Sequence, residues 1–129
     1  MAKLTKEDLK LIEKAKNLAF PKKDHRAITG HVGAALISKD DNLYVGVNID
    51  MPCGIGFCSE QNAISTMITN REFRIKTIVA VRKSGKILPP CGRCREFMYQ
   101  LDKKNKETDV IISKKEKIKL AELLPKTWD

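Results

Sequence analysis

Four side chains in this sequence have the types and the spacing of a site that activates water with a zinc ion. Cys58 and Glu60 are separated by one residue, and further along Pro90 leads directly into the pair Cys91 and Cys94. Thiolates hold Zn²⁺ tetrahedrally, and a catalytic site uses three protein ligands so that the fourth position stays open to water. A glutamate two residues from a ligand reaches that water without binding the metal. The pattern therefore predicts Cys58, Cys91 and Cys94 as zinc ligands and Glu60 as the group that moves the proton.

Other uses of cysteine fit the pattern less well. A disulfide framework suits a short secreted chain, but lysines interrupt the first apolar residues, so we expect no signal peptide. A redox dithiol of the thioredoxin type leaves Cys58 and Glu60 without a role. A structural zinc site normally has a fourth ligand, for which Cys53, His25 and His31 are the candidates. Cys53 is the one near another ligand in sequence, although a small buried or loop thiol is the interpretation we favour.

Length and composition indicate one domain over residues 1–129. A chain of this size is large enough for a hydrophobic core but not for two domains. The hydrophobic content is 42%, and no apolar run reaches the length of a membrane span, so we expect a soluble protein without membrane contact. Cysteines kept free for metal binding point to a reducing compartment, so we expect a cytoplasmic location.

The formal charge of +9 raises the question of nucleic-acid binding. The lysines are spread over the N-terminal helix and two later stretches near residues 103–106 and 114–119, and acidic residues are mixed with them. Aromatic residues make up only 5% of the chain and are not interleaved with the basic ones. We therefore favour a solvated surface and do not expect a nucleic-acid partner.

Helices and strands alternate along the predicted chain. Thr5 and Asp8 form a capping pair that begins a helix, Pro21 ends it, and a turn-forming tetrapeptide at 39–42 joins two strands into a hairpin. In chain order we expect a helix over residues 6–19, an irregular polar segment over 21–30, strands over 32–38 and 43–49, a loop over 50–57, a helix from 58 to about 70, a buried strand over 77–81, a helix after 90 that ends near 102, a short strand over 110–112 and a short helix over 120–124. This order predicts an α/β fold of the three-layer α/β/α sandwich type.

Both cysteine groups are predicted at the N-termini of helices, where unpaired N–H groups carry a partial positive charge. Three thiolates and Zn²⁺ leave one net negative charge, and a bound hydroxide adds a second. Two helix ends and the nearby Arg93 and Arg95 offset this charge, lower the pKa of the bound water and keep the thiolates ionised. The alternative is that both arginines are simply exposed helix residues.

With their flanking stretches, these residues resemble the small cytidine deaminases and, more closely, the blasticidin-S deaminase branch. Cys-x-Glu followed by Pro-Cys-x-x-Cys is typical of zinc-dependent deaminases. The resemblance runs from His31 to Trp128 and includes the sequences at 32–36, 46–49, 58–60, 90–95 and 122–125. It implies a five-stranded mixed sheet flanked by helices, one Zn²⁺ per subunit, and a homotetramer with active sites at subunit interfaces.

The resemblance assigns the zinc ligands and the proton shuttle to the same four residues. It also implies substrate-binding positions. Asn48 matches an asparagine that binds a sugar hydroxyl, and Asp50 stands where cytidine deaminases have a glutamate that contacts the same sugar. Ser59 stands where the family usually has a small apolar residue, at a position that acts through its backbone. Trp128 resembles the C-terminal aromatic residue that closes over a neighbouring subunit's pocket. The alternative is a tail Trp packed on its own core.

Several positions depart from the family. Gln61 replaces an arginine that offsets thiolate charge in cytidine deaminases, which leaves that role to Arg93 or Arg95. Arg93 resembles the blasticidin branch, whereas the loop over residues 50–57 matches neither branch well. The aromatic residue that packs on the pyrimidine is replaced by a glycine, and the next residue, His31, either stacks in its place or begins a strand.

The resemblance implies hydrolytic deamination at C4 of a cytosine nucleoside, with release of ammonia and formation of the uracil product. It does not separate cytidine, deoxycytidine and blasticidin S. A polynucleotide deaminase is an alternative that the charge favours, but the resemblance disfavours it because such enzymes carry His where Cys58 stands. A non-catalytic zinc-stabilised module is a further alternative, which has no use for Glu60.

Overall fold

The computed structural model describes residues 2–129, in which seven strands form one mixed sheet. The strands follow the order β1 (Ala2–Lys3), β7 (Glu116–Lys119), β6 (Asp109–Ile111), β5 (Ile75–Arg82), β3 (Ala27–Ser38) and β2 (Lys22–Asp24), and β4 (Leu43–Asp50) also pairs with β3. β5 and β6 are parallel, and the other pairs are antiparallel. The sheet is mixed, as expected, but it has seven strands instead of five. β1 and β2, at the two ends of the order, are only two and three residues long.

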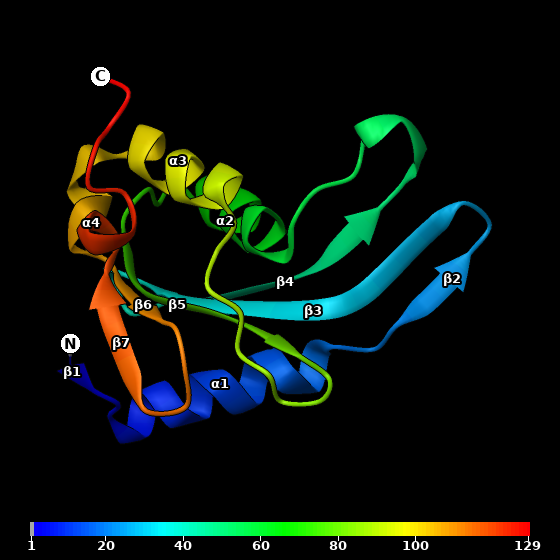
Figure 1. Ribbon diagram of the computed structural model, residues 1–129, viewed down its shortest axis with the longest axis horizontal. Helices are drawn as coiled ribbons and strands as arrows, with labels where there is room; N and C mark the ends of the chain where they lie inside the picture. Colours follow the sequence, from blue (N-terminus) through cyan, green and yellow to red (C-terminus); the bar gives the residue numbers. More distant parts are fainter. Residues whose placement is uncertain (1) are drawn as a thin grey trace.

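Helices cover both faces of the sheet and produce three layers (Figure 1). α1 (Lys6–Leu18) lies on one face, and α2 (Ser59–Thr69), α3 (Gly92–Leu101) and the short α4 (Leu120–Leu123) lie on the other. Two 3-10 turns, η1 (Pro52–Gly54) and η2 (Lys103–Glu107), follow β4 and α3. The expected α/β/α sandwich is confirmed. Among residues 2–129, no helix has the length and apolar character needed to cross a membrane.

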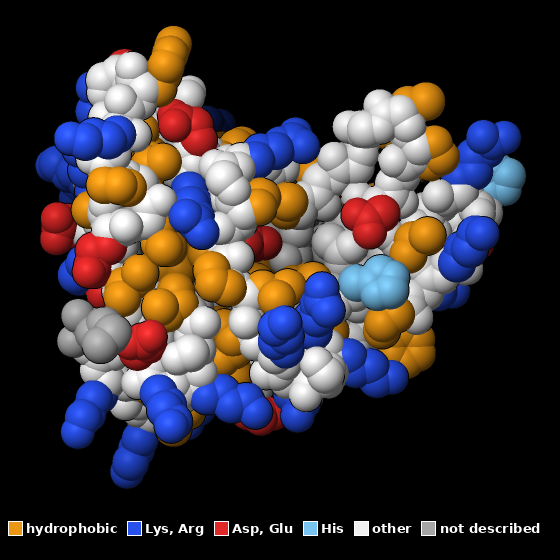
Figure 2. Space-filling view, in the orientation of Figure 1, with side chains coloured by type: hydrophobic (Ala, Val, Ile, Leu, Met, Phe, Trp, Pro, Cys, Tyr) orange, Lys and Arg blue, Asp and Glu red, His pale blue; other side chains and the backbone are white. Residues whose placement is uncertain are grey.

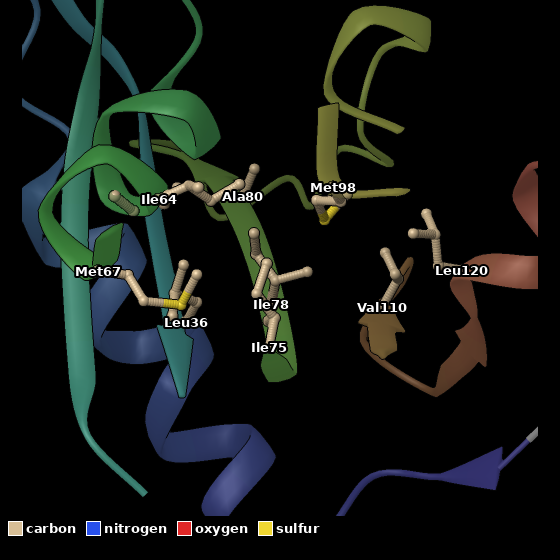
Figure 3. Close-up of a cluster of buried hydrophobic side chains, with 11 residues drawn as sticks. Leu36, Ile64, Met67, Ile75, Ile78, Ala80, Met98, Val110 and Leu120 are labelled. Atoms are coloured by element: carbon tan, nitrogen blue, oxygen red, sulfur yellow. The ribbon is translucent and has the colours of Figure 1, made fainter. Parts of the chain in front are cut away.

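Alternating side chains of the central strands build one hydrophobic core on each face of the sheet. Leu36 of β3 and Ile78 of β5 belong to the cluster under α2 and α3, where Met67 is fully buried beside them (Figure 3). Val79 of β5 is buried in the opposite cluster, with residues of α1. β5 is therefore apolar on both faces, which explains the continuous apolar run at residues 77–81.

A capping box begins α1 at the predicted position. Thr5 Oγ1 accepts a hydrogen bond from the backbone N–H of Asp8 at 3.1 Å, and the Asp8 carboxylate accepts one from the N–H of Thr5 at 2.9 Å. Two N–H groups that have no partner inside the helix are satisfied in this way. The helix ends at Leu18, one residue before its predicted end.

The prediction of an irregular segment over residues 21–30 is wrong. β2 pairs with the first residues of β3 in a hairpin that projects beyond the helices (Figure 1), with Lys22 opposite Thr29. All residues of β2 are exposed, so the strand has no alternation of apolar and polar side chains, and backbone hydrogen bonds hold it. β7, which has Ile118 as its one apolar residue, was not expected for a similar reason.

Candidate metal centre and active-site cleft

The three predicted zinc ligands meet where the N-termini of α2 and α3 converge. Cys58 is the N-cap of α2, Cys91 is the N-cap of α3, and Cys94 lies in the first turn of α3. The Sγ atoms of Cys58 and Cys91 are 3.6 Å apart, as are those of Cys91 and Cys94, and all three lie within 4.8 Å of one another. Neither N-cap thiol forms a side-chain capping hydrogen bond with its helix.

The donor set and its spacing fit a zinc ion. Tetrahedral coordination with Zn–S bonds of about 2.3 Å places sulfur atoms about 3.8 Å apart, close to the spacing of these thiols. Burial raises the pKa of Cys58 and that of Cys94. Burial opposes ionisation of Cys91 as well, but hydrogen bonds from Cys94 and from the Cys58 thiol lower its pKa. Cys91 therefore ionises more easily than the other two thiols, and a divalent cation favours the ionisation of all three.

The other candidate ligands lie outside this cluster. Cys53 is exposed in η1 with a φ of 64°. Among residues 2–129, no further Cys and no His, Asp or Glu side chain joins the three thiols in a metal-binding group. A structural site with four protein ligands is therefore not formed by the described chain, and a zinc ion held by the three thiols would keep a fourth position for water.

Glu60 lies in the first turn of α2, and only 7% of it is exposed. The Ser59 hydroxyl donates a hydrogen bond to Glu60 Oε1 at 2.9 Å. Burial raises the pKa of the Glu60 carboxyl, while its own backbone N–H and the Ser59 hydroxyl partly oppose that shift. Ser59 is 1% exposed, so its side chain holds the carboxylate instead of facing solvent.

Glu60 and two of the thiols line a cleft of about 360 Å³. Val32 of β3 and Ala80 of β5 supply apolar walls, and Asn48 and Asp50 of β4 supply a polar wall. The face of the molecule in Figure 2 is hollowed between the helices and the projecting ends of β3 and β4. A cleft of this kind, with few polar groups converging on it, is typical of a small-molecule site.

Asn48 and Asp50 form a fixed polar pair, because their spacing of two residues puts both side chains on one face of β4. Asn48 Oδ1 accepts a hydrogen bond from the N–H of Val32 at 2.8 Å, and Asn48 Nδ2 donates one to Asp50 Oδ2 at 3.1 Å. Asn48 is buried, whereas Asp50 is exposed. The Asp50 carboxylate therefore keeps acceptor capacity for the hydroxyl groups of a ligand.

The two arginines at the start of α3 have different partners. Arg93 is exposed and lines the cleft. Arg95 Nε donates a hydrogen bond to the Pro90 carbonyl at 2.7 Å, and Arg95 Nη1 donates one to the Leu123 carbonyl at 3.2 Å. Of the two, Arg93 is therefore the cleft residue, and Arg95 binds backbone oxygens.

Two aromatic candidates from the sequence do not line the cleft. Trp128 is 77% exposed, which excludes the interpretation in which its ring packs on the core of its own subunit. His31 is also exposed, and its neighbour Val32 lines the cleft instead. His31 is therefore a residue of β3 that does not line this cleft.

Phe57 was not expected at the site, yet it lines the cleft. An antiparallel bridge to Ile49 holds its backbone, with N···O distances of 2.9 and 3.0 Å, and 38% of the residue is exposed. Its place in the sequence, directly before Cys58, was the available signal. Phe57 supplies an aromatic surface that the residues preceding Val32 do not supply.

Comparison with known proteins identifies a zinc-binding deaminase family and individual deaminases as relatives. Residues 5–108 match the family described as the cytidine and deoxycytidylate deaminase zinc-binding region. A blasticidin-S deaminase from Bacillus cereus is 31% identical over 105 residues, which cover 74% of this chain and 73% of that protein. A cytidine deaminase from Halalkalibacterium halodurans is 34% identical over 71 residues, or 54% of each chain, so this match spans about half of that relative.

Solved structures share the fold. The crystal structure of cytidine deaminase from Mycobacterium leprae superimposes with a TM-score of 0.77 at 26% identity, covering 95% of this chain and all of that one. Cytidine deaminase from Mycobacterium tuberculosis gives a TM-score of 0.79 at 22% identity, covering 98% of this chain and 99% of that one, a likeness of fold.

The fold and the site together define a zinc-binding hydrolase of the deaminase class. The chain belongs to the cytidine and deoxycytidylate deaminase family. Its cofactor is one zinc ion per subunit, for which the three-thiol cluster is the binding site.

Proposed function

We propose that this protein removes the 4-amino group of a free cytosine nucleoside by hydrolysis, releasing ammonia and the corresponding uracil nucleoside. The observation that carries the proposal is the buried carboxylate of Glu60 beside three thiols, in a cleft open to solvent. A structural zinc site has no use for that carboxylate, whereas hydrolysis of a cytosine ring needs a group that moves protons. The similarity to a blasticidin-S deaminase and to cytidine deaminases supports a cytosine ring as the substrate.

Glu60 is the catalytic residue of the proposed reaction. Cys58, Cys91 and Cys94 would hold the zinc ion, which would lower the pKa of a bound water molecule and so make it a nucleophile for C4. Glu60 accepts a proton from the water and passes it to N3 of the ring; it then accepts the second proton from the hydroxyl that the water leaves on C4 and delivers it to the departing amino group. Because the Ser59 hydroxyl holds Oε1, Oε2 is the oxygen that exchanges protons. The carboxylate is thus oriented before the substrate arrives.

The polar pair on β4 binds the sugar in this proposal. Val32 and Asp50 hold the Asn48 side chain in one orientation, and the exposed Asp50 carboxylate accepts hydrogen bonds from sugar hydroxyls. Phe57 and Val32 contact the base from the cleft walls. Arg93, at the same cleft, offsets the negative charge of the thiolates.

The subunit is a single deaminase domain that assembles into a homotetramer in the reducing cytoplasm. Exposed apolar side chains support assembly: Ile55 is 64% exposed, Phe97 38% and Trp128 77%. Trp128 closes over the cleft of a neighbouring subunit. Four unpaired cysteines support the reducing compartment.

An ultraviolet assay tests the substrate. Protein of measured zinc content is incubated separately with cytidine, deoxycytidine and blasticidin S, and loss of the 4-amino chromophore is followed. Turnover of cytidine or deoxycytidine indicates nucleoside salvage, and turnover of blasticidin S alone indicates detoxification. A single-stranded oligocytidine tests the polymer alternative, which predicts steep salt dependence. Full zinc content with no turnover of any nucleoside contradicts the proposal.

Subunit mixing tests the role of Trp128. Trp128→Ala is expected to raise KM roughly tenfold, the effect of losing one buried aromatic contact. When this variant is reassembled with inactive Glu60→Gln subunits, the latter supply Trp128 to clefts that still hold Glu60, and KM recovers in part. A mixture whose KM equals that of the Trp128→Ala protein contradicts closure by the neighbouring subunit.

A further inference from the structure

The C-terminal segment is fastened to α3 at two points. Arg95 Nη1 donates to the carbonyl of Leu123, the last residue of α4, at 3.2 Å. Tyr99 OH, about one turn further along α3, donates to the carbonyl of Asp129 at 3.2 Å. Residues 124–129 therefore run between two contacts with the helix that carries Cys94, and Figure 1 shows this red segment rising beside α3.

The same guanidinium holds the loop that delivers a metal ligand. Arg95 Nε donates to the carbonyl of Pro90 at 2.7 Å, and Pro90 is buried directly before Cys91. A guanidinium carries five N–H donors in a rigid plane, so one side chain spans two carbonyls in a fixed geometry. The Leu123 carbonyl lies at a helix C-terminus, where carbonyls have no partner within the helix. Among residues 2–129, Arg95 forms no ion pair with an acidic side chain.

We propose that Arg95 is a positioning residue that couples the C-terminal segment to the metal-binding loop. Displacing the Pro90 carbonyl displaces the adjacent Cys91, and displacing the Leu123 carbonyl displaces the segment that carries Trp128. Loss of Arg95 therefore loosens metal retention and the C-terminal segment together. The coupling depends on the zinc site and not on which nucleoside is the substrate.

The alternative is that Arg95 only stabilises α3 and does not position the metal-binding loop. Arg74 provides a matched control for this alternative, because it also contacts α3. Arg74 Nε lies 3.3 Å from Asp102 Oδ2, and the two side chains are 29% and 28% exposed. Asp102 is the C-cap of α3, so this contact supports the helix at the end remote from the thiols. Arg74, directly before β5, supports the same helix from outside, so Arg74→Met removes a half-buried arginine contact to α3 without touching the metal loop.

Zinc release from the loaded protein into a colorimetric chelator is the first measurement. Arg95→Met is expected to release zinc about tenfold faster or more, in line with the effect of residues that orient metal ligands. Arg95→Lys should be intermediate, because an ammonium replaces one of the two contacts, and Arg74→Met should stay within about twofold of wild type. Thermal unfolding confirms that each variant is folded. Wild-type release from Arg95→Met, or equal acceleration by Arg74→Met, overturns the proposal.

Fluorescence anisotropy of Trp128, the single tryptophan of the chain, reports the other half of the coupling. Anisotropy is expected to fall in Arg95→Met, to fall less in Arg95→Lys and to be unchanged in Arg74→Met. Fast zinc release with unchanged anisotropy would confine Arg95 to the metal loop and overturn the coupling. Neither readout requires turnover, so a failed substrate assay does not affect the outcome.

Discussion

Two partly buried polar clusters lie on opposite faces of the sheet, and their charges are compensated in different ways. On the α1 face, Lys117 Nζ lies 2.8 Å from Asp8 and 3.6 Å from Asp109, and Lys119 lies 2.8 Å from Asp109. Two cations there meet two carboxylates. On the other face, the three thiols and Glu60 are all acidic, and among residues 2–129 no Lys or Arg nitrogen is hydrogen-bonded to any of them.

The presence or absence of a compensating cation distinguishes the lysine–aspartate cluster, which supports the fold, from the thiol cluster, which can bind a metal ion. Charges that pair within the chain leave nothing for a ligand to satisfy, so the lysine–aspartate cluster contributes to stability alone. Acidic groups gathered without a cation are costly until a cation arrives, and they remain reactive afterwards. The comparison predicts that variants of the thiol cluster abolish zinc binding or turnover, and that variants of the lysine–aspartate cluster change stability only.

Removing one thiol should have the largest effect. Cys91→Ala leaves two ligands, so zinc content is expected to fall well below one per chain, and thermal stability should fall with it because metal binding is coupled to folding. Elemental analysis after desalting measures the first and calorimetry the second. Cys53→Ala, which changes an exposed thiol outside the cluster, is the control and should keep full zinc. One zinc per chain in Cys91→Ala would refute the ligand assignment.

Neutralising Glu60 should abolish turnover while leaving the metal in place. Glu60→Gln keeps the size of the side chain but cannot accept the proton, so kcat is expected to fall about 100-fold or more. Glu72→Gln is the matched control, since the Glu72 carboxylate accepts hydrogen bonds from Tyr44 and Asn42 away from the cleft. Steady-state assays on zinc-loaded protein decide the matter. A Glu60→Gln protein that kept more than about a tenth of wild-type kcat would contradict the catalytic role.

Breaking the lysine–aspartate cluster should change stability without changing chemistry. Asp8→Asn leaves Lys117 with the more distant partner alone, and we expect a loss of roughly 2–4 kcal/mol in the free energy of unfolding at pH 7. Zinc content and kcat should stay at wild-type values. Urea denaturation measures the loss, and reduced zinc content in Asp8→Asn would contradict the separation of the two clusters.

The stability difference between wild type and Asp8→Asn should depend on pH, because the Asp8 carboxylate stabilises the fold only while it is ionised. Burial alone would raise the pKa of Asp8, but hydrogen bonds from Lys117 and Thr5 outweigh it and hold the pKa below its ordinary value of 3.8. A group with a lowered pKa stabilises the fold above its unfolded value, and the contribution is lost as the pH falls through the folded value. The difference in unfolding free energy between wild type and Asp8→Asn should therefore be full at pH 7 and shrink below about pH 4. A difference that grows toward low pH would reverse the assignment.

Removing Lys119, the exposed member of the lysine–aspartate cluster, should have the smallest effect on stability. Lys119 pairs with Asp109, but its side chain is 49% exposed, against 13% for Lys117. Exposed ion pairs contribute little because water screens them, so Lys119→Met is expected to change the free energy of unfolding by less than about 1 kcal/mol. Urea denaturation of Lys119→Met and Asp8→Asn under the same conditions compares their losses of unfolding free energy directly. Equal losses from the two variants would show that burial does not set the strength of these pairs.

Many of the helix ends and strands were predictable, because the sequence signals that mark them are local. The capping box at Thr5 and Asp8, the buried strand around Val79 and the proline before Cys91 each depend on a few neighbouring residues. β2 and β7 were not predictable in the same way, because their side chains carry no apolar alternation and backbone hydrogen bonds to the adjacent strand hold them. Backbone pairing of that kind becomes visible only once the sheet has formed.

Residue type and spacing alone predict the chemistry of the site, because they decide which side chains can bind zinc and which can move a proton. The sequence also placed Cys58 and Cys91 at helix starts, since helix ends are marked by local residues. The folded arrangement was needed to show that Cys53 stays outside the cluster, that Phe57 lines the cleft and that Arg95 joins Pro90 to Leu123. These outcomes depend on where two helices and the chain end meet in space. No spacing along the chain encodes that meeting, because packing of the sheet against its helices produces it.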